Sequence, residues 1–266
     1  MSGIVTRFAP SPNGLLHAGH ALSALIAYRT AKQAGGRFLL RIEDIDVTRA
    51  RAEYVAAIRE DLTWLGLDWE EPVLVQSEHF PDYLAAASRL IAEGLLYPCF
   101  ATRAEIAAAA HPGRHDPAGA PLYPGLWREA SEAAIADRLA AGEVPAFRLD
   151  MPAALRRASE KCHGAPLTFI EIEGARGARE VPAEPERWGD AVIVRKEFPA
   201  SYHLAVVVDD ARQGVTHVTR GADLFAATGL QRLLQVLLDL EAPAYAHHRL
   251  IRWSDGRKLS KSNGDM

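Results

Sequence analysis

Residues 7–20, which read RFAPSPNGLLHAGH, constrain the fold more than any other stretch of this chain. The apolar residues 4–8 predict a short buried strand, and the prolines and glycine that follow predict a turn. A pattern at helical spacing begins near His20 and ends at the glycine pair 35–36, which predicts a helix. A strand, a tight turn and a helix N-terminus leave backbone N–H groups aimed at one place, where they can bind an anion such as phosphate.

His17 and His20 lie at the start of this predicted helix, and their rings can add hydrogen-bond donors toward phosphate oxygens. Gly19 between them allows a ring or a base to lie close to the backbone. Taken alone, the H-x-G-H pattern is explained equally well by two histidines that only cap a helix. The sequence KLSKS at residues 258–262 provides a second cationic loop, which favours a nucleotide held between the two segments.

Four motifs in a fixed order carry a resemblance to a known family: RFAPSP from residue 7, H-x-G-H from residue 17, RIEDID from residue 41 and KLSKS from residue 258. With these motifs the chain resembles the catalytic domain of class I glutamyl-tRNA synthetases, and within that group the short glutamyl-queuosine tRNA(Asp) synthetases. The resemblance covers nearly the whole chain. It implies a ligase that converts glutamate and ATP, with Mg²⁺, to glutamyl-adenylate without tRNA. The enzyme would then transfer glutamate to queuosine in the anticodon loop of tRNA(Asp).

The resemblance also assigns roles to residues at matching positions. The implied glutamate-binding residues are Arg7, Ala9, Ser11, Glu43, Tyr202 and Arg220. The implied ATP-binding residues are His17, Gly19, His20, Lys258, Ser260 and Lys261. Among them the two histidines and two lysines would be catalytic, because positioned donors stabilise the charge that develops as pyrophosphate departs. Glu43 would bind the α-amino group, and the Arg220 guanidinium can grip the side-chain carboxylate with two parallel hydrogen bonds.

Without the resemblance, the chemistry of these residues also allows simpler interpretations of their roles. Glu43 is also compatible with a solvated acidic turn, and Tyr202 with ordinary core packing. Arg220 could form an ion pair with one of three nearby acids, namely Asp209, Asp210 and Asp223. The lysine loop could be a solvated basic segment.

The alternation of strand and helix patterns predicts an α/β fold, a Rossmann-like doubly wound parallel sheet with ligands at its C-terminal edge. We assign residues 1–96 and 190–266 to this nucleotide-binding catalytic domain. The nearly continuous apolar run 205–208 predicts a central strand, and leucines between residues 230 and 238 predict a core helix. Residues 97–189 break the pattern and predict an inserted α+β subdomain, which in the family grips the acceptor end of tRNA.

The predicted insertion departs from the family in one respect. Many of the short synthetases bind zinc through a Cys-x-Cys…Tyr-x-x-x-Cys constellation. Here Cys99 and Tyr123 occupy the first and third positions, but Ala101 and Trp127 replace the other two cysteines. Because a structural zinc takes four ligands, we expect none, and we expect Trp127 to fill the space by apolar packing. Two replacement ligands stay open, His111 and His115.

Composition limits the partners only loosely. Lys and Arg total 30 and Asp and Glu total 34, a net charge of −4, so an RNA partner must use a local basic face. The sequence contains no signal peptide and no apolar run long enough to span a membrane, so we expect a cytoplasmic protein without a membrane partner. We also expect a monomer whose 2 cysteines are reduced.

Three other functions are compatible with parts of this pattern. A truncated glutamyl-tRNA synthetase would keep the chemistry and charge the 3′ end of tRNA(Glu). Only residues 263–266 follow the lysine loop, which argues against an anticodon-binding region, although a trimmed C-terminus stays open. A small-molecule adenylyltransferase would also use H-x-G-H at a helix start, but would need neither Arg220 nor the insertion. A non-catalytic paralogue would bind glutamate or RNA.

Overall fold

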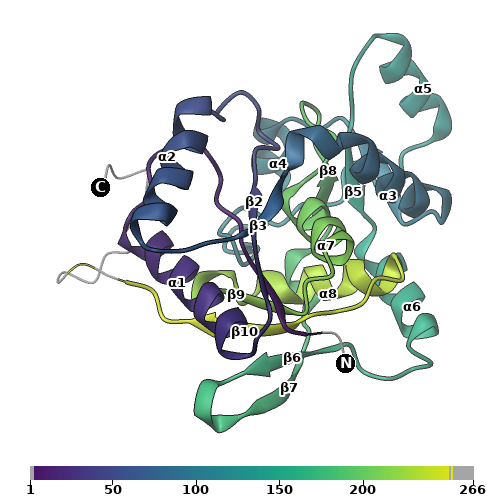
Figure 1. Cartoon of the computed structure of the whole chain (residues 1–266). Coiled ribbons are helices and arrows are strands. Elements are labelled where there is room, and N and C mark those ends of the chain that lie inside the picture. The colour runs from purple at the N-terminus through teal and green to yellow at the C-terminus, as the bar shows by residue number, and fades with distance from the viewer. Residues whose placement is uncertain (1–2, 252, 254–266) are drawn as a thin grey trace.

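A computed structural model describes residues 3–251 and 253 of the chain (Figure 1). The strands are β1 (Val5–Phe8), β2 (Arg37–Ile42), β3 (Glu70–Val75), β4 (Leu96–Cys99), β5 (Ala146–Leu149), β6 (Thr168–Ile172), β7 (Ala178–Pro182), β8 (Val192–Val194), β9 (His217–Gly221) and β10 (Ala244–His248). The α-helices are α1 (Ala18–Gln33), α2 (Ala52–Trp64), α3 (Phe80–Ala92), α4 (Arg103–Ala109), α5 (Glu132–Ala140), α6 (Met151–Lys161), α7 (Tyr202–Arg212) and α8 (Ala227–Leu237). Short 3₁₀ helices are η1 (Gln76–His79), η2 (Gly174–Arg176), η3 (Pro185–Trp188) and η4 (Ala222–Leu224).

The parallel strands confirm the predicted Rossmann-like class. β1, β2 and β3 pair in parallel, and so do β9, β10 and β6, with β7 antiparallel at the edge. The two groups meet where the backbone N–H of Thr216 donates to the carbonyl of Val5 at 3.0 Å. The strands therefore run β3-β2-β1-β9-β10, and the order reverses between β1 and β9, where folds of this type bind nucleotides.

Strand β2 shows how the sheet is covered on both faces. Phe38, Leu40 and Ile42 point to one side, where they pack with buried residues of α1 and α2. Arg41 points to the opposite side, toward two aspartates of α7. Successive side chains of a strand alternate between faces, so a sheet with helices on both sides requires this pattern.

The prediction of a central strand at residues 205–208 is wrong, because these residues lie within α7. The Ser201 hydroxyl accepts a hydrogen bond from the backbone N–H of Leu204 and caps the helix. The first three residues of the run, Ala205, Val206 and Val207, are buried, since α7 packs against α3 on one side and α8 on another. A helix buried in this way has an apolar run like that of a buried strand, and periodicity cannot separate the two.

Hydrogen bonding crosses the predicted domain boundaries. β6 lies within residues 97–189 but pairs in parallel with β10 of the main sheet. β8 lies after that segment but completes a small antiparallel sheet in the order β4-β5-β8. The division into a catalytic domain and an insertion stays a prediction. Over the described part of the chain, none of the helices is both long and apolar enough to cross a membrane.

Candidate active site

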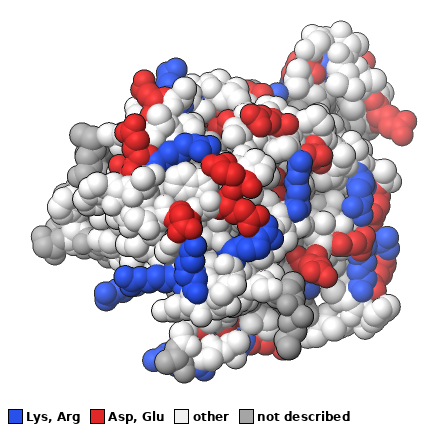
Figure 2. All heavy atoms as spheres, in the orientation of Figure 1, with Lys and Arg blue, Asp and Glu red and all other residues white. Residues whose placement is uncertain are grey.

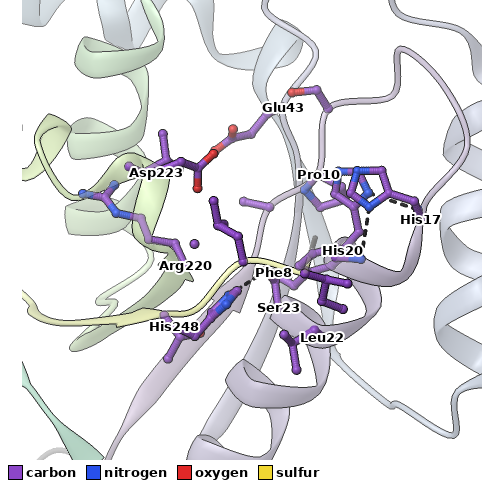
Figure 3. Close-up of a pocket in the computed structure, with 18 of the residues that line it drawn as sticks. Phe8, Pro10, His17, His20, Leu22, Ser23, Glu43, Arg220, Asp223 and His248 are labelled. Carbon is purple, nitrogen blue, oxygen red and sulfur yellow. Dashed lines mark hydrogen bonds between the residues drawn. The ribbon is translucent and has the colours of Figure 1, made fainter. Parts of the chain in front are cut away.

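A cavity of about 520 Å³ opens at the carboxyl ends of β1, β9 and β10, where the strand order reverses. It brings together the following predicted residues: Arg7, Ala9, Ser11, His17, Gly19, His20, Glu43, Tyr202 and Arg220. In Figure 3 the two histidines lie on one side of the cavity, and Arg220 and Asp223 lie on the other. The remaining three, Lys258, Ser260 and Lys261, lie outside the described residues.

The histidines cap helix α1 and do so with only one nitrogen each. His17 is the N-cap residue, and its Nδ1 accepts from the backbone N–H of Gly19 at 3.1 Å. Nδ1 of His20 accepts from the backbone N–H of His17 at 3.1 Å, and the ring centroids are 3.8 Å apart. Because Nδ1 is the acceptor in both rings, the neutral rings carry their protons on Nε2. Nε2–H is therefore the donor of each ring.

Gly19 is required by the position of the His17 ring. A Cβ atom at residue 19 would lie 2.9 Å from Cε1 and 3.1 Å from Nδ1 of that ring. Contacts this short force a shift of the imidazole. In the structure, the group that lies close to Gly19 is the His17 ring of the same motif.

A network of buried charges lies beneath the cavity. Arg7 donates to Asp210 at 2.9 Å, and Arg41 donates to the same carboxylate at 2.8 Å. Arg41 also lies 3.4 Å from Glu43 and 3.9 Å from Asp209, and its side chain is 0% exposed. Two guanidinium groups thus face three carboxylates in a region from which water is largely excluded.

The pKa values of the carboxyl groups in this network shift in opposite directions. Burial raises the pKa of Glu43 and of Asp209, although Arg41 opposes the shift in both cases. Burial acts the same way on Asp210, but Arg7 and Arg41 together outweigh it and lower the pKa of that carboxyl. Residue chemistry in the sequence did not point to Arg41, because its two aspartate partners, Asp209 and Asp210, lie more than 160 residues away in the sequence.

Arg220 is held by uncharged groups instead of the acids that the sequence left open. Its Nε donates to Nε2 of His247 at 3.1 Å, and its terminal nitrogens donate to Gln231 at 2.8 Å and Thr228 at 2.7 Å. Asp209 and Asp210 are engaged with Arg41. Arg220 thus lines the cavity with its guanidinium held by neutral acceptors.

Several residues of the cavity were not predicted. Nε2 of His248 lies 2.8 Å from the Ser23 hydroxyl and so joins β10 to α1. Asp223 follows β9 and lines the same side as Arg220. A Cβ atom at residue 221 would lie 2.4 Å from the Asp223 carboxylate, so Gly221 permits this packing. The sequence RGAD at residues 220–223 was the signal that could have indicated Asp223 as a cavity residue.

The zinc-like positions form a small packed cluster. The Cys99 thiol donates to the Tyr123 hydroxyl at 3.3 Å, and that oxygen also accepts from the backbone N–H of Trp127 at 2.9 Å. Trp127 packs beside Ala101 and Cys99, as expected from the apolar replacement. His111 and His115 are exposed. Within residues 3–251 and 253, no three metal-binding side chains converge.

Comparison with known proteins agrees with this geometry. Residues 3–266 match the family described as tRNA synthetases class I (E and Q), catalytic domain. The chain belongs to this family. It is 45% identical over 265 residues to the glutamyl-Q tRNA(Asp) synthetase of Rhodobacter capsulatus, with 97% of this chain and 91% of that protein covered. The family predicted from the four motifs is therefore confirmed.

Longer members of the family are also similar. The chain is 39% identical over 263 residues to glutamate--tRNA ligase 2 of Rhodospirillum rubrum, which covers 99% of this chain and 52% of that protein. The crystal structure of the glutamate-tRNA synthetase from Elizabethkingia anophelis superposes with a TM-score of 0.75 at 27% identity, over 99% of this chain and 54% of that one. The synthetase chain described here thus spans about half the length of these two proteins.

A half-buried histidine next to the cavity residue Tyr202 makes the stability of this synthetase sensitive to acid. Burial lowers the pKa of His203 to about 4, with Arg220 and Arg195 adding to the effect, and its ring packs against Trp188 and Tyr202. In the unfolded chain, His203 binds its proton near pH 6.5. As pH falls, the unfolded chain therefore takes up this proton before the folded chain does. The free energy of unfolding is therefore expected to fall as pH drops from about 6.5 to about 4, by about 1–2 kcal/mol from this residue.

Urea unfolding at pH 7.5 and pH 5.0 tests this expectation. His203→Asn removes the titrating group, so the variant should lose about 1–2 kcal/mol less than the wild type between the two pH values. Other acid-sensitive groups remain in both proteins and cancel in the comparison. Equal losses in the two proteins would contradict the assigned role of His203.

Proposed function

We propose that this chain activates glutamate with ATP to form glutamyl-adenylate and then transfers glutamate to tRNA, with queuosine of tRNA(Asp) as the acceptor. One observation carries the proposal: a single cavity combines a helix N-terminus for phosphate, a carboxylate for an amino group and a guanidinium for a second carboxylate. These groups belong to α1, Glu43 and Arg220. Similarity to the protein named glutamyl-Q tRNA(Asp) synthetase supports queuosine as the acceptor.

The first proposed step needs no covalent intermediate with the protein. An oxygen of the glutamate α-carboxylate attacks the α-phosphorus of ATP, and pyrophosphate leaves from the opposite side. His17 and His20 donate from Nε2 to phosphate oxygens, and backbone N–H groups at the start of α1 add further donors. Lys258 and Lys261, outside the described residues, are proposed to neutralise the departing pyrophosphate. In the second step the acceptor attacks the carbonyl carbon of the adenylate, and AMP leaves.

The remaining predicted residues fix the amino acid. Glu43, with a side chain 9% exposed, is proposed to bind the α-amino group, and Arg220 the side-chain carboxylate. Tyr202 begins α7 and, together with Ala9 and Ser11, shapes the wall between these two groups. An amino acid held at both ends places its α-carboxylate at a defined distance from the nucleotide.

Mg²⁺ is expected to enter with ATP. The described residues provide no cluster of three ligands, so they do not form a protein cage for the ion. Mg²⁺ in nucleotide sites is held mainly by substrate phosphates and water, with one or two carboxylates. We therefore assign no step to the ion.

His17→Asn is expected to separate catalysis from helix capping. Asn is a good N-cap residue, so its side-chain oxygen can replace Nδ1 as the acceptor for Gly19. The shorter side chain cannot place a donor where Nε2 lies. Loss of one donor to a developing phosphate charge is expected to lower kcat by about 100- to 1000-fold. Pyrophosphate exchange measures kcat, and thermal unfolding checks the helix.

His17→Ala provides the matched comparison. This variant loses the capping acceptor as well as the donor, so it should also lose about 0.5–2 kcal/mol of stability. A full kcat in His17→Asn would support the alternative in which His17 only caps α1.

Glutamate-dependent ATP–pyrophosphate exchange without tRNA tests the first step, with glutamine and aspartate as controls. Exchange with glutamate alone supports the adenylating site. Exchange that ignores all three amino acids would favour a small-molecule adenylyltransferase. Binding of ATP and glutamate without exchange, with or without tRNA, would favour a non-catalytic paralogue.

Separate transfer assays then identify the acceptor. Labelled glutamate should transfer to tRNA(Asp) that carries queuosine and not to the same tRNA lacking it. Transfer to the 3′ end of tRNA(Glu) would favour the second candidate, which similarity to a glutamate--tRNA ligase keeps open. Over the described residues in Figure 2, Lys and Arg are interspersed with Asp and Glu, so any RNA contact on this face must use a small basic area.

A further inference from the structure

The three nitrogens of the Arg220 guanidinium each donate to a neutral acceptor. Nε donates to His247, one terminal nitrogen to Gln231 and the other to Thr228, at 3.1, 2.8 and 2.7 Å. A guanidinium has five N–H donors, so these three bonds use one donor on each nitrogen. One N–H on each terminal nitrogen is not used by these three bonds.

His247 can accept from Arg220 only in one tautomer, and Glu171 selects that tautomer. The Glu171 carboxylate lies 2.8 Å from Nδ1 of His247 and also accepts from the backbone N–H of that residue at 2.9 Å. An ionised carboxylate only accepts, so the ring proton lies on Nδ1. Nε2 is then the acceptor for Arg220 and for the Thr228 hydroxyl, which lies 3.2 Å away.

The neutral ring separates two opposite charges. The His247 side chain is 2% exposed, and burial followed by Arg220 lowers its pKa to about 3. A carboxylate in direct contact with Arg220 would neutralise the guanidinium and compete with an acidic ligand. With the imidazole between them, Glu171 fixes the orientation of Arg220 without occupying its carboxylate-binding edge.

We infer that Glu171 and His247 are positioning residues that orient Arg220 and keep its charge available to the substrate, and so set the preference for an amino acid with an acidic side chain. This inference rests on the proposed function. Neither residue contacts the cavity as a lining residue; both act through Arg220. Their effect should therefore appear in the use of glutamate and not in the use of ATP.

Pyrophosphate exchange with varied glutamate and varied ATP tests the inference. His247→Leu removes the acceptor for Nε of Arg220, and the KM for glutamate is expected to rise about tenfold while the KM for ATP stays within about twofold. His247→Gln returns an acceptor oxygen and should recover most of the loss. Glu171→Gln permits the other tautomer, which turns an N–H toward Arg220, so it should raise the glutamate KM in the same direction.

Introduction of a negative charge beside Arg220 tests specificity. His247→Asp places a carboxylate within reach of Arg220, so the ratio of kcat/KM for glutamate to that for glutamine should fall by at least about tenfold. If His247 had a purely structural role, its replacement would lower kcat/KM for glutamate and for glutamine together. His217→Leu and His217→Gln, on the adjacent strand β9 and outside the cavity, are matched controls that should leave both KM values unchanged.

The outcomes separate this inference from the proposed function. A wild-type enzyme without glutamate-dependent exchange rejects the proposed function. An active wild type, with unchanged glutamate KM in both His247→Leu and Glu171→Gln and an unchanged ratio in His247→Asp, supports the function and overturns the positioning role. If His247→Leu does not fold, the shape-preserving Glu171→Gln and the His247→Asp ratio decide the question.

Discussion

Arg220→Gln is expected to lower kcat/KM for glutamate by about 30- to 1000-fold, which corresponds to about 2–4 kcal/mol of lost binding to the transition state. The guanidinium is 5% exposed, and its described acceptors are all uncharged. A substrate carboxylate would therefore meet a charge that is little screened by water. An amide offers neither the charge nor the two parallel donors. Pyrophosphate exchange with varied glutamate measures the loss.

Arg212→Gln is the matched control for this prediction. Arg212 ends α7, is 46% exposed at its side chain and pairs with Asp82 away from the cavity. Its replacement should leave kcat/KM within about twofold, because exposed ion pairs contribute little. Glutamate should also raise the unfolding temperature of the wild type and of Arg212→Gln, but not of Arg220→Gln. A normal response in Arg220→Gln would remove Arg220 from the proposed glutamate site.

Local patterns predicted the backbone on the histidine side of the cavity well. The strand, turn and helix start at residues 4–20 are contiguous in the sequence, so spacing alone predicted a strand at residues 4–8 and a helix start near His20, close to the observed Val5–Phe8 and the N-cap at His17. Glu43 was placed by the same argument, since it follows strand β2. What spacing could not reveal was that Nδ1 of each histidine is engaged in capping.

The buried half of the site could not be predicted from local patterns. Residues 205–208 of helix α7 were interpreted as a strand because their apolar run is largely buried, and this hid the position of Asp209 and Asp210 opposite β2. The partners of Arg41 and Arg220 depend on which face of the sheet each helix covers. His247 lies within β10 and belongs to no motif, so only the packed structure shows that it joins Glu171 to Arg220.

Helix α7 therefore links the stability of the fold to the site. Its first residue, Tyr202, lines the cavity, and its Asp209 and Asp210 hold the arginines of β1 and β2 beneath it. Arg7 belongs to both the cavity and the buried network, since it lines the cavity and pairs with Asp210. A substitution in the buried network is consequently expected to lower the free energy of unfolding before it lowers the rate of the reaction.

Arg41→Gln is expected to lower the free energy of unfolding at pH 7.5 by about 3–5 kcal/mol, because it leaves buried carboxylates without their main counter-charge. Arg41 is 0% exposed and lies within 3.9 Å of Glu43, Asp209 and Asp210. Arg37→Gln is the control on the same strand. Its ion pair with Glu70 is half exposed, so that loss should stay below about 1 kcal/mol.

The pH dependence of the Arg41→Gln defect distinguishes an electrostatic cause from a packing defect. Burial already raises the pKa of Glu43 and Asp209, and removal of Arg41 should raise both further. A carboxyl with a raised folded pKa binds its proton more readily in the folded chain, so its stability contribution is lost as pH rises through that pKa. Urea unfolding should therefore show a smaller deficit relative to wild type at pH 5.5 than at pH 7.5. A deficit that is equal at the two pH values would mean that Arg41 stabilises the fold by packing alone.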